Sequence, residues 1–243
     1  MWTGYFDDSG THRDSRVVVV GGLIGRVAQW ESFEEAWKAK LADPLPKVKK
    51  PPLRKFALAD CNSLKGEFLG YSPADAAVDT HDFRQILIAN KLIGFAAAIE
   101  RPAWQELVMS RSPPPFKEDL EECVCKCVEE VLSVAQRSDD GLAAAVFDQG
   151  FWTSRLGDMI KEYTLPLGFP RLVRFSYTPV VDTVGLQGAD MVATENYWHA
   201  GKQLALGVGA GPRAHMRHYL DNMFHEGIIL DRGGIETLLS SVE

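Results

Sequence analysis

The sequence predicts an α/β protein with a mixed β-sheet and helices on both of its faces. Two β-rich segments lie close together near the start of the chain, with a short polar turn between them. A stretch of helical and proline-rich segments follows. Beyond it, short apolar segments alternate with segments of helical spacing, which is typical of a sheet flanked by helices.

The first two strands are expected to pair as an antiparallel hairpin. Residues 2–7 are apolar and aromatic and lead into an Asp-Asp-Ser-Gly turn. Residues 16–25 contain four consecutive valines, which is typical of a strand buried on both faces. Because only residues 9–15 separate the two segments, a hairpin is the simplest connection.

Residues 27–93 are expected to form an insertion of helices and loops. Aromatic residues recur at helical spacing in residues 30–41, which predicts a helix there. Residues 43–55 contain four prolines and five basic residues, so we expect an exposed basic loop. A short strand is expected at residues 56–59, and a second helix at residues 80–93.

The rest of the chain predicts alternating elements within one domain that spans residues 1–243. Strands are expected at 95–99, 142–147 and 172–177, and helices at 117–137, 151–163 and 186–199. Residues 201–243 are expected to form a C-terminal extension that ends in a short closing element.

Composition and charge favour a globular protein of the cytoplasm. The 243 residues are 46% hydrophobic, enough to bury one large core. The net charge of −7 argues against a surface that binds nucleic acid everywhere, yet it is compatible with an acidic metal site beside a local basic patch. The longest apolar run, Val17–Ile24, is far shorter than the ~20 residues of a membrane helix, so no membrane partner is expected.

The four cysteines are expected to be reduced and partly buried. Three of them follow the spacing Cys-x-Cys-x-Cys within a predicted helix, at Cys123, Cys125 and Cys127, and the fourth is Cys61. A zinc site usually needs two ligand pairs with recognisable spacing, which this pattern lacks. The six histidines include no His-x-x-x-His pair, so a zinc hydrolase is not expected.

Three aspartates occupy positions that suit a divalent-metal site. Asp7 and Asp148 each end a predicted strand, and strand ends are where α/β sheets bind ligands. Asp190 lies beside the apolar stripe of a predicted helix, where an unpaired charge is costly. A turn would also explain Asp7, and a helix cap would explain Asp148. Carboxylates from separate elements are what Mg²⁺ or Mn²⁺ needs to promote attack of water on a phosphodiester.

Further candidate residues surround these acids. Asp8 follows Asp7 directly, and Glu67 is either a further carboxylate of the site or a solvated loop residue. Gln187 shares a helix face with Asp190 and either orients water or phosphate or bonds to the backbone. The basic loop is either a contact for a nucleic-acid backbone or a solvated surface, and its candidates are Lys47, Lys49, Lys50, Arg54 and Lys55.

These features, taken in order along the chain, resemble the uncharacterised bacterial DUF3800 family. The matching segments are Tyr5–Gly10, Val17–Gly22, Asp60 with Lys65–Phe68, Asp148 and Leu186–Asp190, and the resemblance covers most of the chain, up to about residue 200. The resemblance implies an RNase H-like fold of the retroviral integrase superfamily. In such folds the first acid lies on the central strand, another ends the neighbouring strand, and the last lies on the C-terminal helix. By that analogy Asp7, Asp148 and Asp190 take these places.

The leading expectation is a metal-dependent nuclease or phosphodiesterase. Two departures from the family pattern, Asp8 in place of glutamate and Ala57 in place of histidine, favour an alternative. That alternative is a non-catalytic RNase H-like module that binds nucleic acid or protein. A lesser alternative is a haloacid-dehalogenase-like phosphatase with Asp7 as nucleophile, but Ser9 stands where that motif has its second aspartate.

Overall fold

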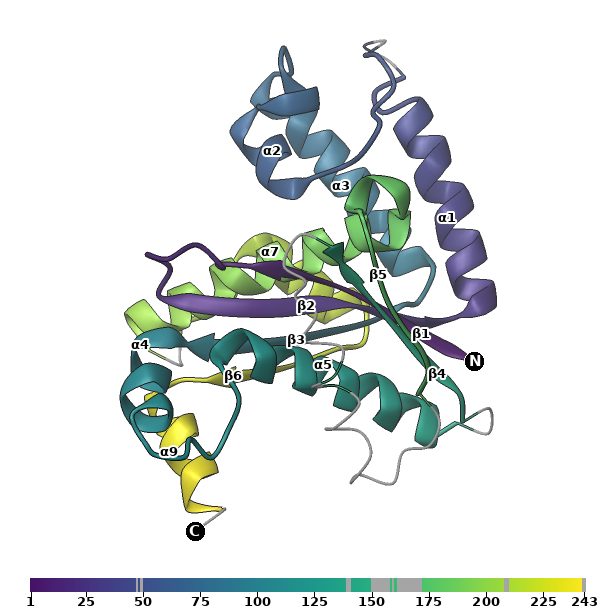
Figure 1. The fold of residues 1–243 in the computed structure, drawn as a ribbon. Helices are drawn as coiled ribbons and strands as arrows, with labels where there is room; N and C mark the ends of the chain where they lie inside the picture. The colour runs from purple at the N-terminus through teal and green to yellow at the C-terminus, as the bar shows by residue number, and fades with distance from the viewer. Residues whose placement is uncertain are drawn as a thin grey trace.

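A six-stranded mixed sheet lies at the centre of the molecule (Figure 1). The computed structural model describes residues 1–46, 48, 50–138, 141–149, 158, 160, 172–207 and 210–241. The strands are β1 (Trp2–Ser9), β2 (Val17–Arg26), β3 (Ile93–Glu100), β4 (Ala143–Asp148), β5 (Leu172–Thr178) and β6 (His225–Leu230). Their order across the sheet is β5-β4-β1-β2-β3-β6, so β1 and β2 are the central pair.

The sheet combines an antiparallel half with parallel additions on both sides. β2 pairs antiparallel with β1 on one side and with β3 on the other. The three remaining pairs are parallel: β4 with β1, β5 with β4, and β6 with β3. The predicted N-terminal hairpin is therefore confirmed. All of β2 except Arg26 is buried, as its run of valines predicts.

Helices cover both faces of the sheet, as expected. The described helices are α1 (Val27–Ala42), α2 (Leu58–Ser63), α3 (Pro73–Ala89), α4 (Arg101–Trp104), α5 (Asp119–Gln136), α7 (Val184–Leu206), α8 (Ala214–Asn222) and α9 (Arg232–Ser240). Figure 1 shows α5 on one face, α7 on the other, and α1, α2 and α3 together at one end. Among the described helices, none combines the length and the hydrophobicity needed to span a bilayer.

The prediction of a short strand at residues 56–59 is wrong. Phe56 and Ala57 have no regular structure, and α2 begins at Leu58. The ring of Phe56 is buried among other aromatic rings, including those of Phe68 and Phe83, so this position requires a hydrophobic side chain. Tertiary burial, rather than strand pairing, therefore explains this short apolar segment.

Other parts of the insertion depart from expectation in their boundaries. The helix expected at residues 80–93 begins at Pro73, after the capping residue Ser72, and ends at Ala89. The loop of residues 43–55 has no helix or strand among its described residues, but Leu45 and Leu53 are buried, so it is not exposed throughout. The helix expected at 151–163 falls outside the described residues, except for positions 158 and 160.

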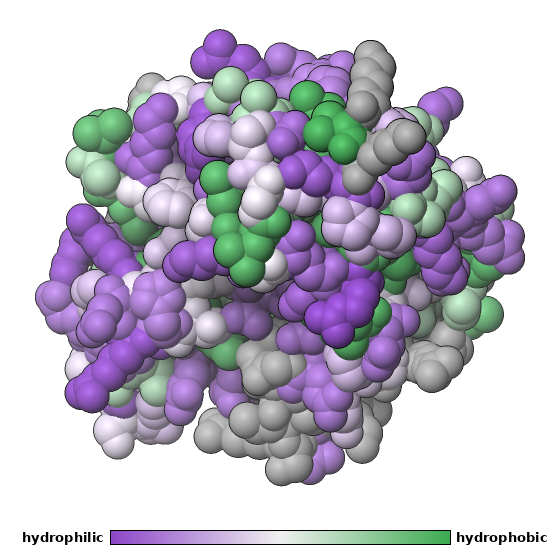
Figure 2. All heavy atoms as spheres, turned by 90° about the horizontal axis from the view of Figure 1, so that it is seen from above, coloured by the Kyte–Doolittle hydropathy of each residue, from purple (hydrophilic) through white to green (hydrophobic). Residues whose placement is uncertain are grey.

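The surface at the end formed by α1, α2 and α3 is mostly hydrophilic (Figure 2). Hydrophobic side chains on this face form small, separate patches rather than one broad surface. Isolated apolar side chains of this kind are normal on a protein surface.

Candidate functional site

β1 and β4 place Asp7 and Asp148 side by side. Phe6 pairs with Phe147 in the parallel register of these strands, and their rings stack with centroids 5.3 Å apart. The next residue on each strand is an aspartate, and neighbouring strands are ~4.8 Å apart. Because successive side chains alternate between faces, and both phenylalanines pack on the α5 side, both carboxylates are directed to the α7 side.

Small residues let α7 approach this face closely enough to bring Asp190 to the same edge. A Cβ atom added to Gly21 of β2 would lie 3.1 Å from the Cα atom of Ala193. One added to Gly185 would lie 2.7 Å from the ring of Tyr5. Larger side chains at these glycines would push the helix away from β1 and β2, and Asp190 with it.

A backbone N–H group orients each of the three carboxylates. The N–H of Asp8 donates to the Asp7 carboxylate at 2.8 Å, that of Val180 to Asp148 at 3.2 Å, and that of Leu58 to Asp190 at 2.8 Å. Hydrogen bonds of this kind stabilise the charged form of a carboxylate and restrict its rotation. The bond from Leu58 also shows that the insertion reaches the acids, which no motif in the sequence indicates.

The pKa values show that the carboxylates repel one another. Burial raises the pKa of Asp7 well above its ordinary value, and the negative charges of Asp190, Asp8 and Asp148 raise it further, against the lowering effect of the Asp8 N–H. Burial also raises the pKa of Asp190 to about 6, although the Leu58 N–H and the charge of Lys55 lower it. Asp7 itself is only 7% exposed. A bound cation would relieve this repulsion.

The three carboxylates are chemically suitable ligands for a hard divalent cation, because Mg²⁺ and Mn²⁺ prefer carboxylate oxygens. Over the part of the chain that the structure describes, however, no three His, Cys, Asp or Glu side chains are grouped as a ready-made metal site. Asp7, Asp148 and Asp190 therefore lie at one edge, but their side chains would have to close further to hold one ion.

Lys55 is the residue of the basic loop that lies beside the acids. It lines a cavity of about 480 Å³ together with Asp148, Gln149 and the segment Pro179–Val181. Its positive charge is among the causes that lower the pKa of Asp190. The loop thus supplies one cation to the acidic edge.

The other two described basic residues of the loop, Lys50 and Arg54, contact residues of the insertion itself. Lys50 donates to the carbonyl of Gly70 and lies 4.8 Å from the ring centroid of Tyr71. Arg54 pairs with Glu67 at 3.3 Å, so Arg54 and Glu67 are structural partners of each other within the insertion. Lys47 and Lys49 lie outside the described residues.

Gln187 connects three elements and is fully buried. Its Oε1 accepts hydrogen bonds from the indole N–H of Trp37 at 3.0 Å and from the backbone N–H of Phe56 at 2.9 Å. This geometry favours the alternative in which Gln187 bonds to the protein rather than to phosphate. Asp8 remains at the edge, and burial raises its pKa, with Thr11 lowering it and Asp148 raising it.

Within the described part of the chain, the four cysteines belong to no group of side chains that could hold a metal. All four are free and buried, and burial raises the pKa of the Cys125 thiol to about 12. Neutral thiols of this kind behave as small apolar core residues.

Fold and site together define an α/β protein with three aspartates at one edge of a mixed sheet. Comparison with models of known families gave no match, and comparison with curated proteins gave none either.

Proposed function

We propose that the protein is a metal-dependent hydrolase of phosphodiesters, a nuclease with an RNase H-like fold that resembles the DUF3800 family. The observation that carries the proposal is the convergence of Asp7, Asp148 and Asp190 on the α7 side of one sheet edge. Asp7 lies on a central strand, Asp148 at the end of the neighbouring strand and Asp190 on a late helix. This is the distribution that the resemblance implies.

The chain's own residues would position the substrate and hold the charge of the site. Mg²⁺ or Mn²⁺, when bound, activates water and stabilises charge on a phosphodiester. Asp7, Asp148 and Asp190 would hold the ion, with their orientation restricted by the backbone N–H groups that bind them. The Lys55 ammonium lines the cavity beside Asp148 and would attract a phosphate oxygen of the substrate.

The test is thermal unfolding with and without Mn²⁺, for the wild type and for Asp148→Asn. An ion at 100 times its Kd stabilises the native state by ~2.7 kcal/mol, which is about 5–10 °C in a domain of this size. We expect that rise in the wild type and its loss in Asp148→Asn. The control Glu34→Gln removes a half-exposed carboxylate on α1 and should keep the rise.

A cleavage screen then separates the two main functions. Single- and double-stranded DNA, RNA and hybrids would be incubated with Mn²⁺, and cleavage that Asp148→Asn abolishes supports the hydrolase. The second candidate is a non-catalytic module, which the hydrogen bond from Leu58 to Asp190 favours because it gives that carboxylate a structural partner. A wild type that shows neither stabilisation nor cleavage would overturn the hydrolase in favour of this module.

A further inference from the structure

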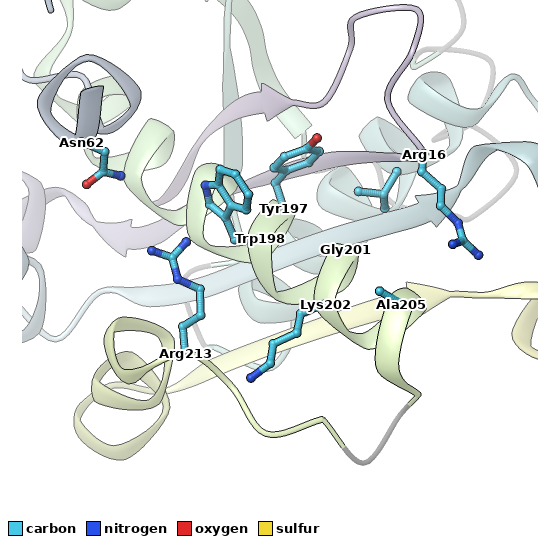
Figure 3. Close-up of a pocket in the computed structure, with 9 residues that line it drawn as sticks. Arg16, Asn62, Tyr197, Trp198, Gly201, Lys202, Ala205 and Arg213 are labelled. Carbon is cyan, nitrogen blue, oxygen red and sulfur yellow. The ribbon is translucent and has the colours of Figure 1, made fainter. Parts of the chain in front are cut away.

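A second surface feature, lined by both polar and apolar groups, lies further along α7, away from the three acids. It is a groove of about 840 Å³, and its lining includes Arg16, Asn62, Trp198, Lys202 and Arg213 (Figure 3). Arg16, Lys202 and Arg213 are cationic, and the lining residues include no carboxylate. Arg16 pairs with Glu100, outside the lining, at 3.0 Å, so Lys202 and Arg213 carry most of the argument for positive charge. In a chain with a net charge of −7, this local concentration of positive charge favours an anionic ligand.

Aromatic rings form part of the same groove. Trp198 is 51% exposed, and the guanidinium of Arg213 lies 5.5 Å from the centroid of its ring. The ring of Tyr197 meets that of Trp198 edge to face, with centroids 5.7 Å apart. Exposed aromatic rings and guanidinium planes are surfaces on which nucleic-acid bases stack, while nearby cations bind the phosphates.

The groove leads towards the acidic edge. Tyr197 follows Asp190 by seven residues on α7, so the two lie on the same helix face, ~10 Å apart along its axis. The hydroxyl of Tyr197 contacts the Ser15 hydroxyl at 3.3 Å, so the ring packs against the turn that follows Asp7 in the β1–β2 hairpin. The groove and the acids therefore share one helix and one turn.

We infer that this groove binds a single-stranded nucleic acid and directs it towards Asp190. The inference rests on the proposed function, because the strand would be the phosphodiester substrate of the acidic edge. A single strand fits better than a duplex, since stacking on Trp198 needs base faces that a duplex covers with neighbouring base pairs.

Gly201 offers a sharp test of this groove. It lies on α7 in the lining, and a Cβ atom added there would meet nothing within 4 Å. Side chains at this position therefore project into open space, and the helix tolerates them because glycine is a weak helix former. Gly201→Glu and Gly201→Lys place opposite charges at one point without disturbing the core.

The measurement is fluorescence anisotropy of a labelled 12-nucleotide oligo-dT, titrated with the full chain in EDTA. We expect Gly201→Glu to weaken binding and Gly201→Lys to strengthen it, each severalfold, because the ligand is anionic. Trp198→Ala should weaken binding about tenfold, in keeping with the loss of one stacked base. Phe224→Ala, which removes another exposed aromatic ring outside the groove lining, is the matched control and should bind as the wild type does.

Three outcomes would overturn the inference. They are equal affinities of the two Gly201 variants, an unchanged affinity of Trp198→Ala, and a hairpin duplex that binds as tightly as the single strand. Because EDTA removes divalent metal, this titration is independent of the metal-binding test. Manganese stabilisation with no effect of the groove variants would refute the groove alone, whereas groove binding with neither manganese stabilisation nor cleavage would refute the hydrolase alone.

Discussion

The two faces of the central sheet bury different kinds of side chain. On the α5 face the core under the body of the helix is apolar, and Cys123, Cys127, Val128 and Val131 are fully buried against the sheet. The buried carboxylates of α5 lie in its first turn, where Asp119 pairs with Arg101 at 2.9 Å. On the α7 face the buried charges lie under the middle of the helix. Glu195 and Arg84 are 1% and 3% exposed, with 4.0 Å between their nearest charged atoms.

The α7 face also contains buried polar atoms that lack hydrogen-bond partners. Within the described residues, both carboxylate oxygens of Glu195 and the Nη2 atom of Arg84 are buried without a hydrogen-bond partner. Buried groups of this kind weaken a fold unless other packing compensates. We infer a division in which the α5 face supplies stability and the α7 face carries the charges on which the proposed hydrolysis depends.

The strongest test of this division is truncation of the apolar side. Phe147 is fully buried under α5 and stacks on Phe6, so Phe147→Ala should lower the free energy of unfolding by ~3–5 kcal/mol. Urea unfolding followed by circular dichroism measures the change. Leu142→Ala, at a 43% exposed side chain just before β4, is the control and should change stability by no more than ~0.5 kcal/mol. A loss for Phe147→Ala as small as the control's would contradict the division.

A smaller loss of stability is expected from a substitution on the α7 face at a residue whose hydrogen bonds are complete. Gln187→Leu would leave the indole N–H of Trp37 and the backbone N–H of Phe56 without their acceptor. Burying unpaired donors should lower the free energy of unfolding by ~1–3 kcal/mol.

A double-mutant cycle checks the cause of that loss. Trp37→Phe removes the indole donor, so the effects of Gln187→Leu and Trp37→Phe should be non-additive by ~0.5–3 kcal/mol. Strict additivity would mean that the hydrogen bond between these side chains contributes nothing to stability.

Local patterns predicted the central elements because those elements are determined by their own residues. The valines of β2 need burial on both faces, and the aromatic spacing of α1 places Trp30, Phe33 and Trp37 on one buried side. The predicted strand end located Asp148 correctly, whereas β1 continues past Asp7 to Ser9, so the prediction that Asp7 ends its strand was wrong. Their register could not be predicted, because it depends on how β1 and β4 align.

Features that depend on distant partners were not predictable. The edge strand β6 is largely exposed and has little hydrophobic pattern, so only its pairing with β3 identifies it. Lys50 and Lys55 look equivalent in the sequence, yet the first packs on Tyr71 while the second lies beside Asp148. Gln187 likewise has a role that only the position of Trp37 and Phe56 reveals.

The smallest expected effect concerns the acids themselves and depends on pH. The pKa of Asp190 is raised from 3.8 to about 6 in the folded protein, mainly by burial. Its contribution to stability is therefore fully present below pH ~4 and is lost as pH rises through ~6. Asp190→Asn removes this titration, so the wild type should lose stability relative to the variant between pH 4 and 7, by on the order of 1 kcal/mol.

Urea unfolding at several pH values measures this difference between wild type and Asp190→Asn. Asp14→Asn, at an exposed turn position, is the control that reports the effect of an aspartate away from the acidic edge. If the difference for Asp190→Asn stays constant with pH, or changes in the opposite direction, Asp190 is not held in a buried, repulsive site. The α7 face would then lose the feature that most distinguishes it from the α5 face, and the acidic edge would lose its main support as a metal site.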